Sequence, residues 1–229
     1  MNDLITKVVE INNARDVIFN IFSQVFSDVP NFEFDNFLSN TAEILIKIAS
    51  ESDNKHLKDG VNLFNCLFEN SYVIDRISLE KRQKDYTRLF MLGQNIVPIY
   101  ESIYTSPEKS MMQESWFRVK TKYHENYFRK DKDIKTAEDH ISLELQFMGL
   151  LSKRVSECFS VEDFNEAETV LTKQIDFYEN HINKWIPIFC EQIIKLQPKL
   201  STDFYPAFSY LLLGFIAEDY KLIKDLCGK

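Results

Sequence analysis

Glycine and proline are scarce in this chain, with 5 Gly and 6 Pro among 229 residues. Tight hairpin turns and phosphate-binding loops both depend on glycine. Each glycine here is isolated, so no phosphate loop of known pattern can be built; the five positions are Gly60, Gly93, Gly149, Gly214 and Gly228. This scarcity disfavours sheets joined by tight turns and favours long helices.

Metal-binding patterns are also missing. None of the four histidines has a glutamate three residues before it, which excludes the Glu-x-x-His pairs of di-iron bundles; they are His56, His124, His140 and His181. There is no Cys-x-x-Cys motif, and the four cysteines are scattered at Cys66, Cys158, Cys190 and Cys227. Unpaired spacing of this kind is typical of reduced thiols in the cytoplasm. We therefore expect no metal and no cofactor.

Positive charge is in deficit, with 27 Lys and Arg against 35 Asp and Glu and a net charge of −8. Nucleic acids and anionic membranes both require clustered Lys and Arg, so neither is expected as the main partner. The N-terminus has neither the basic start nor the apolar stretch of a signal peptide. The longest strongly apolar stretch, Leu211 to Ala217, is too short to span a bilayer. These features predict a cytoplasmic protein with no nucleic-acid partner and no stable membrane insertion.

Large side chains are abundant, since 45% of residues are hydrophobic and 14% aromatic. Apolar residues recur at helical spacing, and the expected helices lie near 4–26, 35–50, 63–68, 78–92, 106–119, 141–155 and 203–226. Two more are expected between 155 and 203: one begins near Asp163, and the next runs through Trp185 to Pro187, which could kink it or mark its boundary. The pattern predicts an all-α fold, a single helical domain over 1–229 with roughly nine to eleven helices. The charged stretch at 129–135 is the best hinge candidate, dividing the domain into halves 1–128 and 137–229.

Smaller features refine this expectation. The segment from Gly93 to Ser106 has no helical period and is predicted to be an apolar loop. A helix is expected to restart at Ser106-Pro107-Glu108, where a cap residue, a proline and an acid follow one another. Ser160 with Asp163 approximates a capping box for the next helix.

Two segments carry a pattern that core packing alone does not explain. The first runs from Tyr86 to Phe90 and resumes from Val97 to Tyr104, and the second covers 138–148. Their apolar residues could simply be core, and Asp139-His140 could simply open a helix. Glu101, however, is a carboxylate in an aromatic, apolar loop, where a charge needs a cationic partner. A carboxylate beside an apolar wall suits an arginine-bearing peptide.

At these segments the chain resembles the twin-arginine leader-binding redox-enzyme chaperones, the family that includes the maturation proteins of dimethyl sulfoxide, trimethylamine N-oxide and nitrate reductases. The family pattern has a Tyr-x-x-Leu-Phe block, a Pro-x-x-Glu-Ser-x-Tyr block, an Asp-His followed by Glu-Leu-x-Phe-Met, and a weaker His-Leu-x-x-Trp element. The corresponding residues are Tyr86, Leu89, Phe90, Pro98, Glu101, Ser102, Tyr104, Asp139, His140, Glu144, Leu145, Phe147, Met148, His181 and Trp185. The chain departs from the family at Thr136-Ala137, where many members have Glu-Pro.

The resemblance implies a cytoplasmic chaperone, not an enzyme, that binds the twin-arginine leader of the apo catalytic subunit of a molybdoenzyme. It also implies help with molybdenum-cofactor insertion and a delay of export until insertion is complete. The family's leader-binding residues correspond here to Leu89, Phe90, Pro98, Tyr100, Asp139 and His140. To these we add Glu101 as a second arginine contact, its neighbour Ser102, and Tyr104 as part of the apolar lining. Both a monomer and a domain-swapped dimer exchanging halves through 129–135 are compatible with the sequence.

The sequence leaves two alternatives to a chaperone. A helical ligand-sensing or regulatory module usually carries a basic DNA-reading helix-turn-helix, and the N-terminal segments lack the Lys and Arg cluster that it needs. An enzyme could instead use His140 with Asp139 or Glu144 as a histidine–carboxylate pair. Nothing in the sequence favours either alternative over the chaperone.

Overall fold

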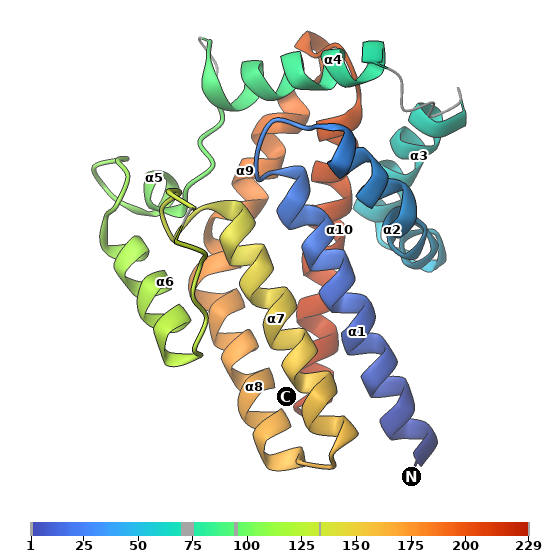
Figure 1. Cartoon of the computed structure of the whole chain (residues 1–229), viewed down its shortest axis with the longest axis vertical. Coiled ribbons are helices and arrows are strands. Elements are labelled where there is room, and N and C mark those ends of the chain that lie inside the picture. Colours follow the sequence, from blue (N-terminus) through green and yellow to red (C-terminus); the bar gives the residue numbers. More distant parts are fainter. Residues whose placement is uncertain (1, 70–75, 94–95, 133, 229) are drawn as a thin grey trace. The chain divides into compact units, whose positions relative to one another are not determined.

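The computed structural model describes residues 2–69, 76–93, 96–132 and 134–228, and this part of the chain is helical without any strand (Figure 1). A single isolated β-bridge joins Tyr100 to His140. The all-α prediction is therefore confirmed. The α-helices are α1 (Asn2–Val25), α2 (Phe32–Glu51), α3 (Lys55–Glu69), α4 (Arg76–Tyr86), α5 (Glu101–Thr105), α6 (Glu114–Glu125), α7 (Ile141–Ser160), α8 (Phe164–Phe177), α9 (Asn183–Leu196) and α10 (Phe204–Leu226). Two π-helical turns, η1 (Thr87–Met91) and η2 (Tyr178–Ile182), and a 3-10 turn, η3 (Gln197–Lys199), complete the elements.

The chain folds into two compact units. The first unit contains Met1–Ser23, Tyr100–Trp185 and Asp219–Lys229, and the second contains Gln24–Ile99 and Ile186–Glu218. The stretch 129–135 lies inside the first unit, and its residue 133 is outside the described part of the chain. A single domain hinged at 129–135 stays a prediction.

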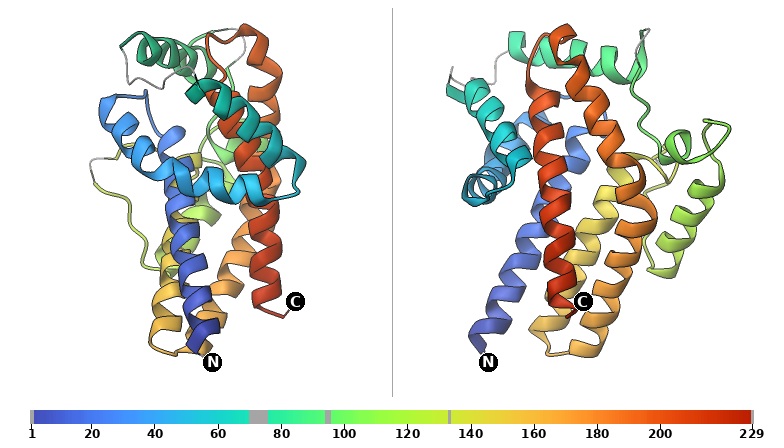
Figure 2. Two further views of the ribbon diagram at one scale, coloured as in Figure 1. Left: turned by 90° about the vertical axis from the view of Figure 1, so that its right-hand side faces the viewer. Right: turned by 180° about the vertical axis from the view of Figure 1, so that it is seen from behind.

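In the first unit, α7 and α8 run side by side (Figures 1 and 2). The apolar stripe predicted for α7 is buried, with Ile141, Leu145, Met148, Leu151 and Val155 all in the core. Asp163 is the N-cap of α8, and its side chain accepts a hydrogen bond from the amide of Glu166 at 3.1 Å. Ser160, which we expected to share this cap, is instead the last residue of α7.

An aromatic cluster holds α6 against α7 and α8. The ring of Tyr123 lies 4.8 Å from that of Phe147, which in turn lies 5.0 Å from Phe177. Lys122 on α6 and Asp176 on α8 form an ion pair of 2.7 Å near this cluster. Rings offset or edge-on at such distances add to the area that they bury. The cluster therefore fixes α6 beside the α7–α8 pair.

In the second unit, glycines allow α3 and α10 to approach closely. A Cβ at Gly214 would lie 2.5 Å from the Leu57 side chain and 2.8 Å from its backbone nitrogen. A Cβ at Gly60 would lie 2.9 Å from the backbone nitrogen of Leu211. Only a residue without a side chain fits at either position, so the two glycines set the spacing of these helices.

A buried ion pair joins α4 to α2 in the same unit. The Arg82 guanidinium donates to both carboxylate oxygens of Asp35, at 2.5 and 2.7 Å, and both side chains are buried. The guanidinium also lies 5.2 Å from the centre of the Phe204 ring. A bidentate pair of this kind leaves neither charge uncompensated, which is the condition for burying both.

Two local predictions were wrong. The helix expected from Ser106 does not form, because Lys109 and Met112 have φ angles of 47° and 57°, in the left-handed region, and α6 begins only at Glu114. The predicted loop from Gly93 to Ser106 contains the short helix α5, although residues 94–95 lie outside the described part. Among the described residues, no helix is long and apolar enough to cross a membrane.

Candidate functional site

The two segments that stood out in the sequence are paired in the first unit. The bridge between Tyr100 and His140 is antiparallel, and the amide of Glu101 donates to the carbonyl of Asp139 at 2.9 Å. The rings of Tyr100 and His140 pack edge to face with their centres 5.1 Å apart. Residues 100–104 and 138–140, which are separated by more than 30 residues of chain, thus form one site.

Asp139 is held by Ser102. One of its carboxylate oxygens, Oδ2, accepts hydrogen bonds from the Ser102 amide, at 2.9 Å, and from the Ser102 hydroxyl. The other oxygen, Oδ1, is buried and has no hydrogen-bonding partner within the described residues. Burial raises the pKa of the Asp139 carboxyl and the charge of Glu101 adds to this rise, while the hydrogen bonds from Ser102 oppose it.

Glu101 pairs with the basic side chain of His181, in line with the expectation that a carboxylate in an apolar segment needs such a partner. Its Oε2 lies 2.9 Å from Nδ1 of His181, and both side chains are buried. The His181 ring stacks on Phe177 with the centres 4.7 Å apart, which fixes the imidazole in place. The remaining polar atoms of the pair, Glu101 Oε1 and His181 Nε2, lack hydrogen-bonding partners in the part of the chain that is described.

A third carboxyl group, Glu144, lies next to this pair. It is on the buried face of α7, and its Oε2 accepts a hydrogen bond of 3.0 Å from the indole of Trp185. Burial raises the pKa of Glu144 well above its usual value, and the charge of Glu101 raises it further. A neutral Glu144 can donate a hydrogen bond to Glu101, which two ionised carboxylates could not share. We call Glu101, Ser102, Asp139, Glu144, His181 and Trp185 the buried polar cluster.

The His140 side chain forms the N-cap of α7. Its Nδ1 accepts a hydrogen bond from the amide of Ser142 at 3.2 Å and lies 2.7 Å from the Ser142 hydroxyl, so the imidazole caps α7. Burial lowers its pKa to about 4. His140 is therefore neutral near pH 7, and its side chain holds the first turn of α7.

A cavity of about 740 Å³ lies beside the buried polar cluster. Tyr104, Phe117 and His181 line it, and the ring of Tyr104 packs 5.3 Å from that of Trp185. Phe117 is 61% exposed, so the cavity offers an accessible aromatic wall. Two of the cations that line the cavity are paired, Arg118 with Glu114 at 3.0 Å and Lys122 with Asp176 at 2.7 Å.

The structure divides the nine predicted site residues between the two units. Tyr100, Glu101, Ser102, Tyr104, Asp139 and His140 lie in the first unit, where they come together. Leu89, Phe90 and Pro98 lie in the second unit. Leu89 and Phe90 are buried there, and the Phe90 ring packs 5.6 Å from Tyr205 and 6.0 Å from Phe189. Pro98 is half-buried.

Sequence reasoning did not include Glu144, His181 and Trp185 in the site. One signal was available, because Glu144 is an acid among the apolar residues that form the buried stripe of α7. A carboxyl group on such a face needs a polar partner, which Trp185 and Glu101 supply. Despite these acids and His181, no group of three or more His, Cys, Asp or Glu residues among those described could hold a metal ion.

Comparison with known proteins identifies the family. The family model described as nitrate reductase delta subunit matches residues 54–191, more than half of the chain. A protein named Chaperone protein TorD from Vibrio parahaemolyticus is 25% identical over 213 residues, which are 91% of this chain and 94% of the relative. One of the same name from Shewanella oneidensis is 21% identical over 223 residues, 95% of this chain and 94% of the relative. One from a Psychrobacter species is 26% identical over 143 residues, and this match spans only 62% of either chain.

These relatives bear the name of chaperones rather than of enzymes, and two of them align along nearly their whole length. The match also covers the residues of the buried polar cluster, from Glu101 to Trp185. The chain therefore belongs to the nitrate reductase delta subunit family, and within it to the TorD-like chaperones that assist the maturation of molybdenum-containing redox enzymes.

Proposed function

We propose that this chaperone acts in the cytoplasm, where it binds the twin-arginine leader of the apo catalytic subunit of a molybdoenzyme. While the leader is held, it is inaccessible to the export machinery, so export waits until the molybdenum cofactor has been inserted. The chaperone also assists that insertion. The observation that carries the proposal is the pairing of residues 100–104 with 138–140, which places two acidic side chains side by side.

The arginine contacts that we propose are Asp139 and Glu101. Asp139 Oδ1 is buried without a hydrogen-bonding partner in the described chain, and Glu101 Oε1 has a donor there only when Glu144 is protonated. A buried carboxylate oxygen with no donor is unfavourable, and a guanidinium group supplies donors in a geometry that matches a carboxylate. Binding the leader would therefore satisfy atoms that the chaperone alone leaves unsatisfied.

Both carboxylates are buried, so the leader reaches them only after a local rearrangement. The Tyr100 side chain is half-buried; burial raises the pKa of its hydroxyl, and the charge of Asp139 raises it further. We propose that the rings of Tyr100 and His140 separate to admit the guanidinium. Because an isolated bridge pairs these two residues, breaking it requires less free energy than unfolding a helix.

The apolar stretch of the leader would occupy the cavity lined by Tyr104 and Phe117. Aromatic walls accept aliphatic side chains of varied shape, as a leader-binding groove requires. Leu89, Phe90 and Pro98 lie in the second unit, and their contact with the leader stays a prediction. Since Leu89 is buried and its carbonyl accepts a hydrogen bond of 2.7 Å from Val97, we propose that it acts by holding the segment that leads to Pro98.

A leader peptide titrated into wild-type protein and into Asp139→Asn tests the proposal. The substitution keeps the shape of the side chain and removes its charge, so we expect affinity to fall by about 1.5–3 kcal/mol, roughly ten- to a hundredfold. Glu168→Gln, which removes an exposed charge of α8, is the matched control and should leave the dissociation constant unchanged. A peptide with lysines in place of both arginines should bind more weakly, because it cannot form bidentate bonds.

Isothermal titration calorimetry gives the affinity, and circular dichroism shows whether Asp139→Asn remains folded. Equal dissociation constants for wild-type and Asp139→Asn protein would remove Asp139 from the site. Equal affinity for the arginine and lysine peptides would contradict recognition of the guanidinium groups.

A further inference from the structure

We infer that a groove on the second unit binds an acidic amphipathic segment of a partner protein, whereas the arginines of the leader are proposed to bind the buried polar cluster of the first unit. This basic groove has a volume of about 980 Å³. Its walls are α4 with η1 on one side and the end of α9 with η3 on the other; the residues that argue for its ligand are Lys84, Arg88, Leu92, Leu196, Lys199 and Leu200.

The two walls of the groove are tied together by hydrogen bonds. The Arg88 guanidinium donates to the carbonyl of Lys199. On the floor, the carboxylate of Asp85 accepts hydrogen bonds from the amides of Ser201, at 2.7 Å, and Thr202, at 2.8 Å. Asp85 is buried and lies in α4, so these bonds fix the connection between α9 and α10 against that helix. These hydrogen bonds therefore hold the two walls of the groove in place within the second unit.

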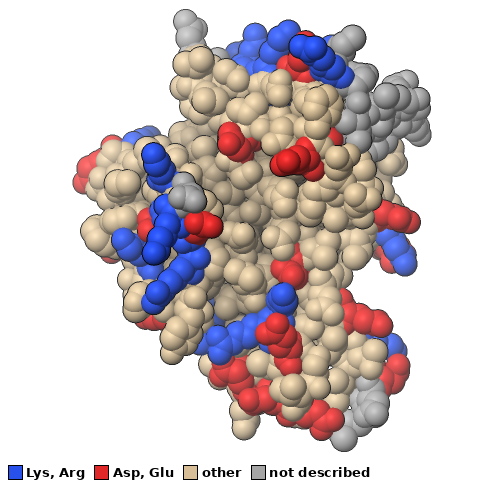
Figure 3. Space-filling view, in the orientation of Figure 1, with Lys and Arg blue, Asp and Glu red and all other residues tan. Residues whose placement is uncertain are grey.

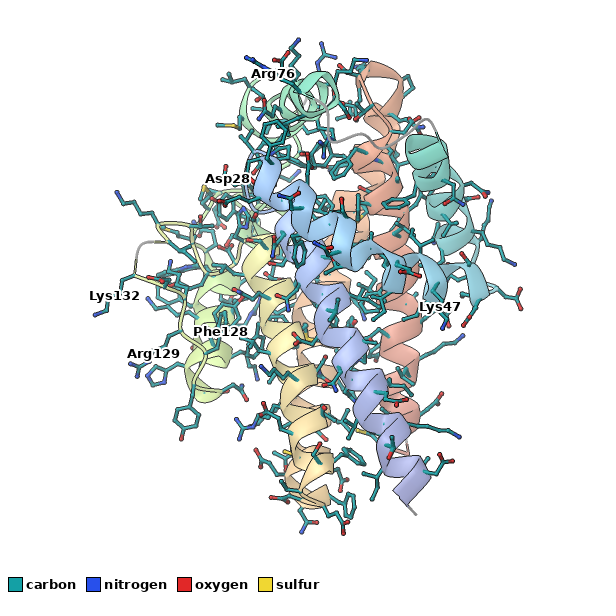
Figure 4. All side chains as sticks on the ribbon, turned by 45° about the vertical axis from the view of Figure 1, so that its right-hand side comes forward. Asp28, Lys47, Arg76, Phe128, Arg129 and Lys132 are labelled. Atoms are coloured by element: carbon teal, nitrogen blue, oxygen red, sulfur yellow. The ribbon has the colours of Figure 1, made fainter. Side chains whose placement is uncertain are left out.

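The exposed charge of the groove is positive. Lys84, Arg88 and Lys199 are exposed, and none forms an ion pair with an acid in the described part of the chain. The acids that line the groove are already engaged, since Glu80 pairs with Arg76 at 3.1 Å and Asp85 accepts amide hydrogen bonds. Figure 3 shows Lys and Arg side chains gathered over α4, and Arg76 extends from the start of this helix in Figure 4. A positive groove contrasts with the net charge of −8 of the whole chain.

The interior of the groove is apolar. Leu89 is buried at its base, Leu196 and Leu200 are half-buried, and Leu92 is 69% exposed at its edge. Leucines between cations complement a helix that carries aliphatic residues on one face and carboxylates beside them. A twin-arginine leader is itself cationic and would be repelled here, so the basic groove and the buried polar cluster select segments of opposite charge.

A pair of synthetic amphipathic helices tests the assignment on the full-length, isotopically labelled protein. Each has about 14 residues, or four turns, with leucines on one face, and the polar face carries glutamates in one peptide and lysines in the other. We expect the glutamate peptide to shift the amide resonances of residues 84–93 and 196–201, and the lysine peptide to leave them unchanged. Because surface charges are screened by salt, binding should weaken when the salt concentration is raised from about 0.05 to about 0.5 M.

Charge reversal at two positions provides the second measurement. Lys84→Glu combined with Lys199→Glu should weaken binding of the glutamate peptide by roughly tenfold or more. Lys47→Glu is the matched control, because Lys47 is an exposed lysine of α2 in the same unit and does not line the groove (Figure 4). It should change the affinity less than twofold.

Three results would overturn the inference. They are resonance shifts outside the groove, equal binding of both peptides, and displacement of the glutamate peptide by inorganic phosphate at comparable concentration, which would mark a site for small anions. Titration of the leader peptide into the double variant separates this inference from the proposed function. Unchanged leader affinity is expected, whether or not the acidic peptide binds.

Discussion

The buried carboxyl group of Glu144 makes a prediction about stability that can be worked out from the structure. In the folded protein its pKa lies well above the usual 4.5, because the group is buried and Glu101 is nearby. In the unfolded chain it titrates at the usual value. Between these two pKa values the folded state keeps a proton that the unfolded state has lost. Stability from this group is therefore complete below pH 4.5 and is lost as the pH rises toward the folded pKa.

Glu144→Gln removes this dependence while keeping the shape of the side chain. The glutamine oxygen can still accept from the Trp185 indole, and its amide can still donate to Glu101. Each pH unit over which only the unfolded state ionises costs the wild-type protein about 1.4 kcal/mol. As the pH rises from 5 to 7, the free energy of unfolding of the variant should thus increase relative to that of wild type until the pH reaches the folded pKa of Glu144.

Urea unfolding at pH 5, 6 and 7 measures this difference, with the fluorescence of the buried Trp185 as a probe near the substitution. Glu168→Gln serves as control, since its exposed side chain should give a difference that is constant with pH. A constant difference for Glu144→Gln as well would mean that Glu144 is ionised in the folded protein. The hydrogen bond from a protonated Glu144 to Glu101 would then be excluded.

Two further predictions concern α7 and α10. Burial lowers the pKa of His140 from 6.5 to about 4, so between these pH values the unfolded chain binds a proton that the folded protein does not. The free energy of unfolding of the wild-type protein should therefore fall by up to about 3 kcal/mol as the pH falls from 6.5 to 4. His140→Asn, which retains a capping side chain, should not show this loss in urea titrations over the same range. Gly214→Ala should lower the free energy of unfolding by about 1–3 kcal/mol, because its Cβ would clash with Leu57. Helix propensity alone predicts a gain of about 1 kcal/mol, so a more stable variant would refute the clash.

The elements that were predictable from the sequence are those whose pattern is long and regular. The stripe from Ile141 to Val155 repeats over four turns, and it forms the buried face of α7. The expected restart at Ser106-Pro107-Glu108 failed because its signals are local. Left-handed residues at Lys109 and Met112 interrupt that segment, and a cap motif carries no information about the backbone conformation of residues beyond the first turn.

The candidate site was predictable in part for a similar reason. Glu101 was recognisable as a buried charge because its neighbours in sequence are apolar. Its partner was not, since His181 is 80 residues further along and pairs with it only through the packing of η2 against α5 in the first unit. The cap formed by His140 was likewise hidden, because histidine is an unusual N-cap residue and the role depends on the rotamer of its side chain.

The buried polar cluster contains three acidic residues at positions where apolar residues would be expected. Replacing a buried ionic group by apolar residues of the same volume is often neutral or stabilising, so Glu101, Asp139 and Glu144 are not needed to hold α5 against α7. Asp139 nevertheless keeps one carboxylate oxygen without a donor in the described structure, and it lies in the same unit as the other two acids. A cluster selected for stability alone would satisfy this atom. An unsatisfied carboxylate oxygen behind a β-bridge is instead what a protein needs to accept a cationic donor from another chain.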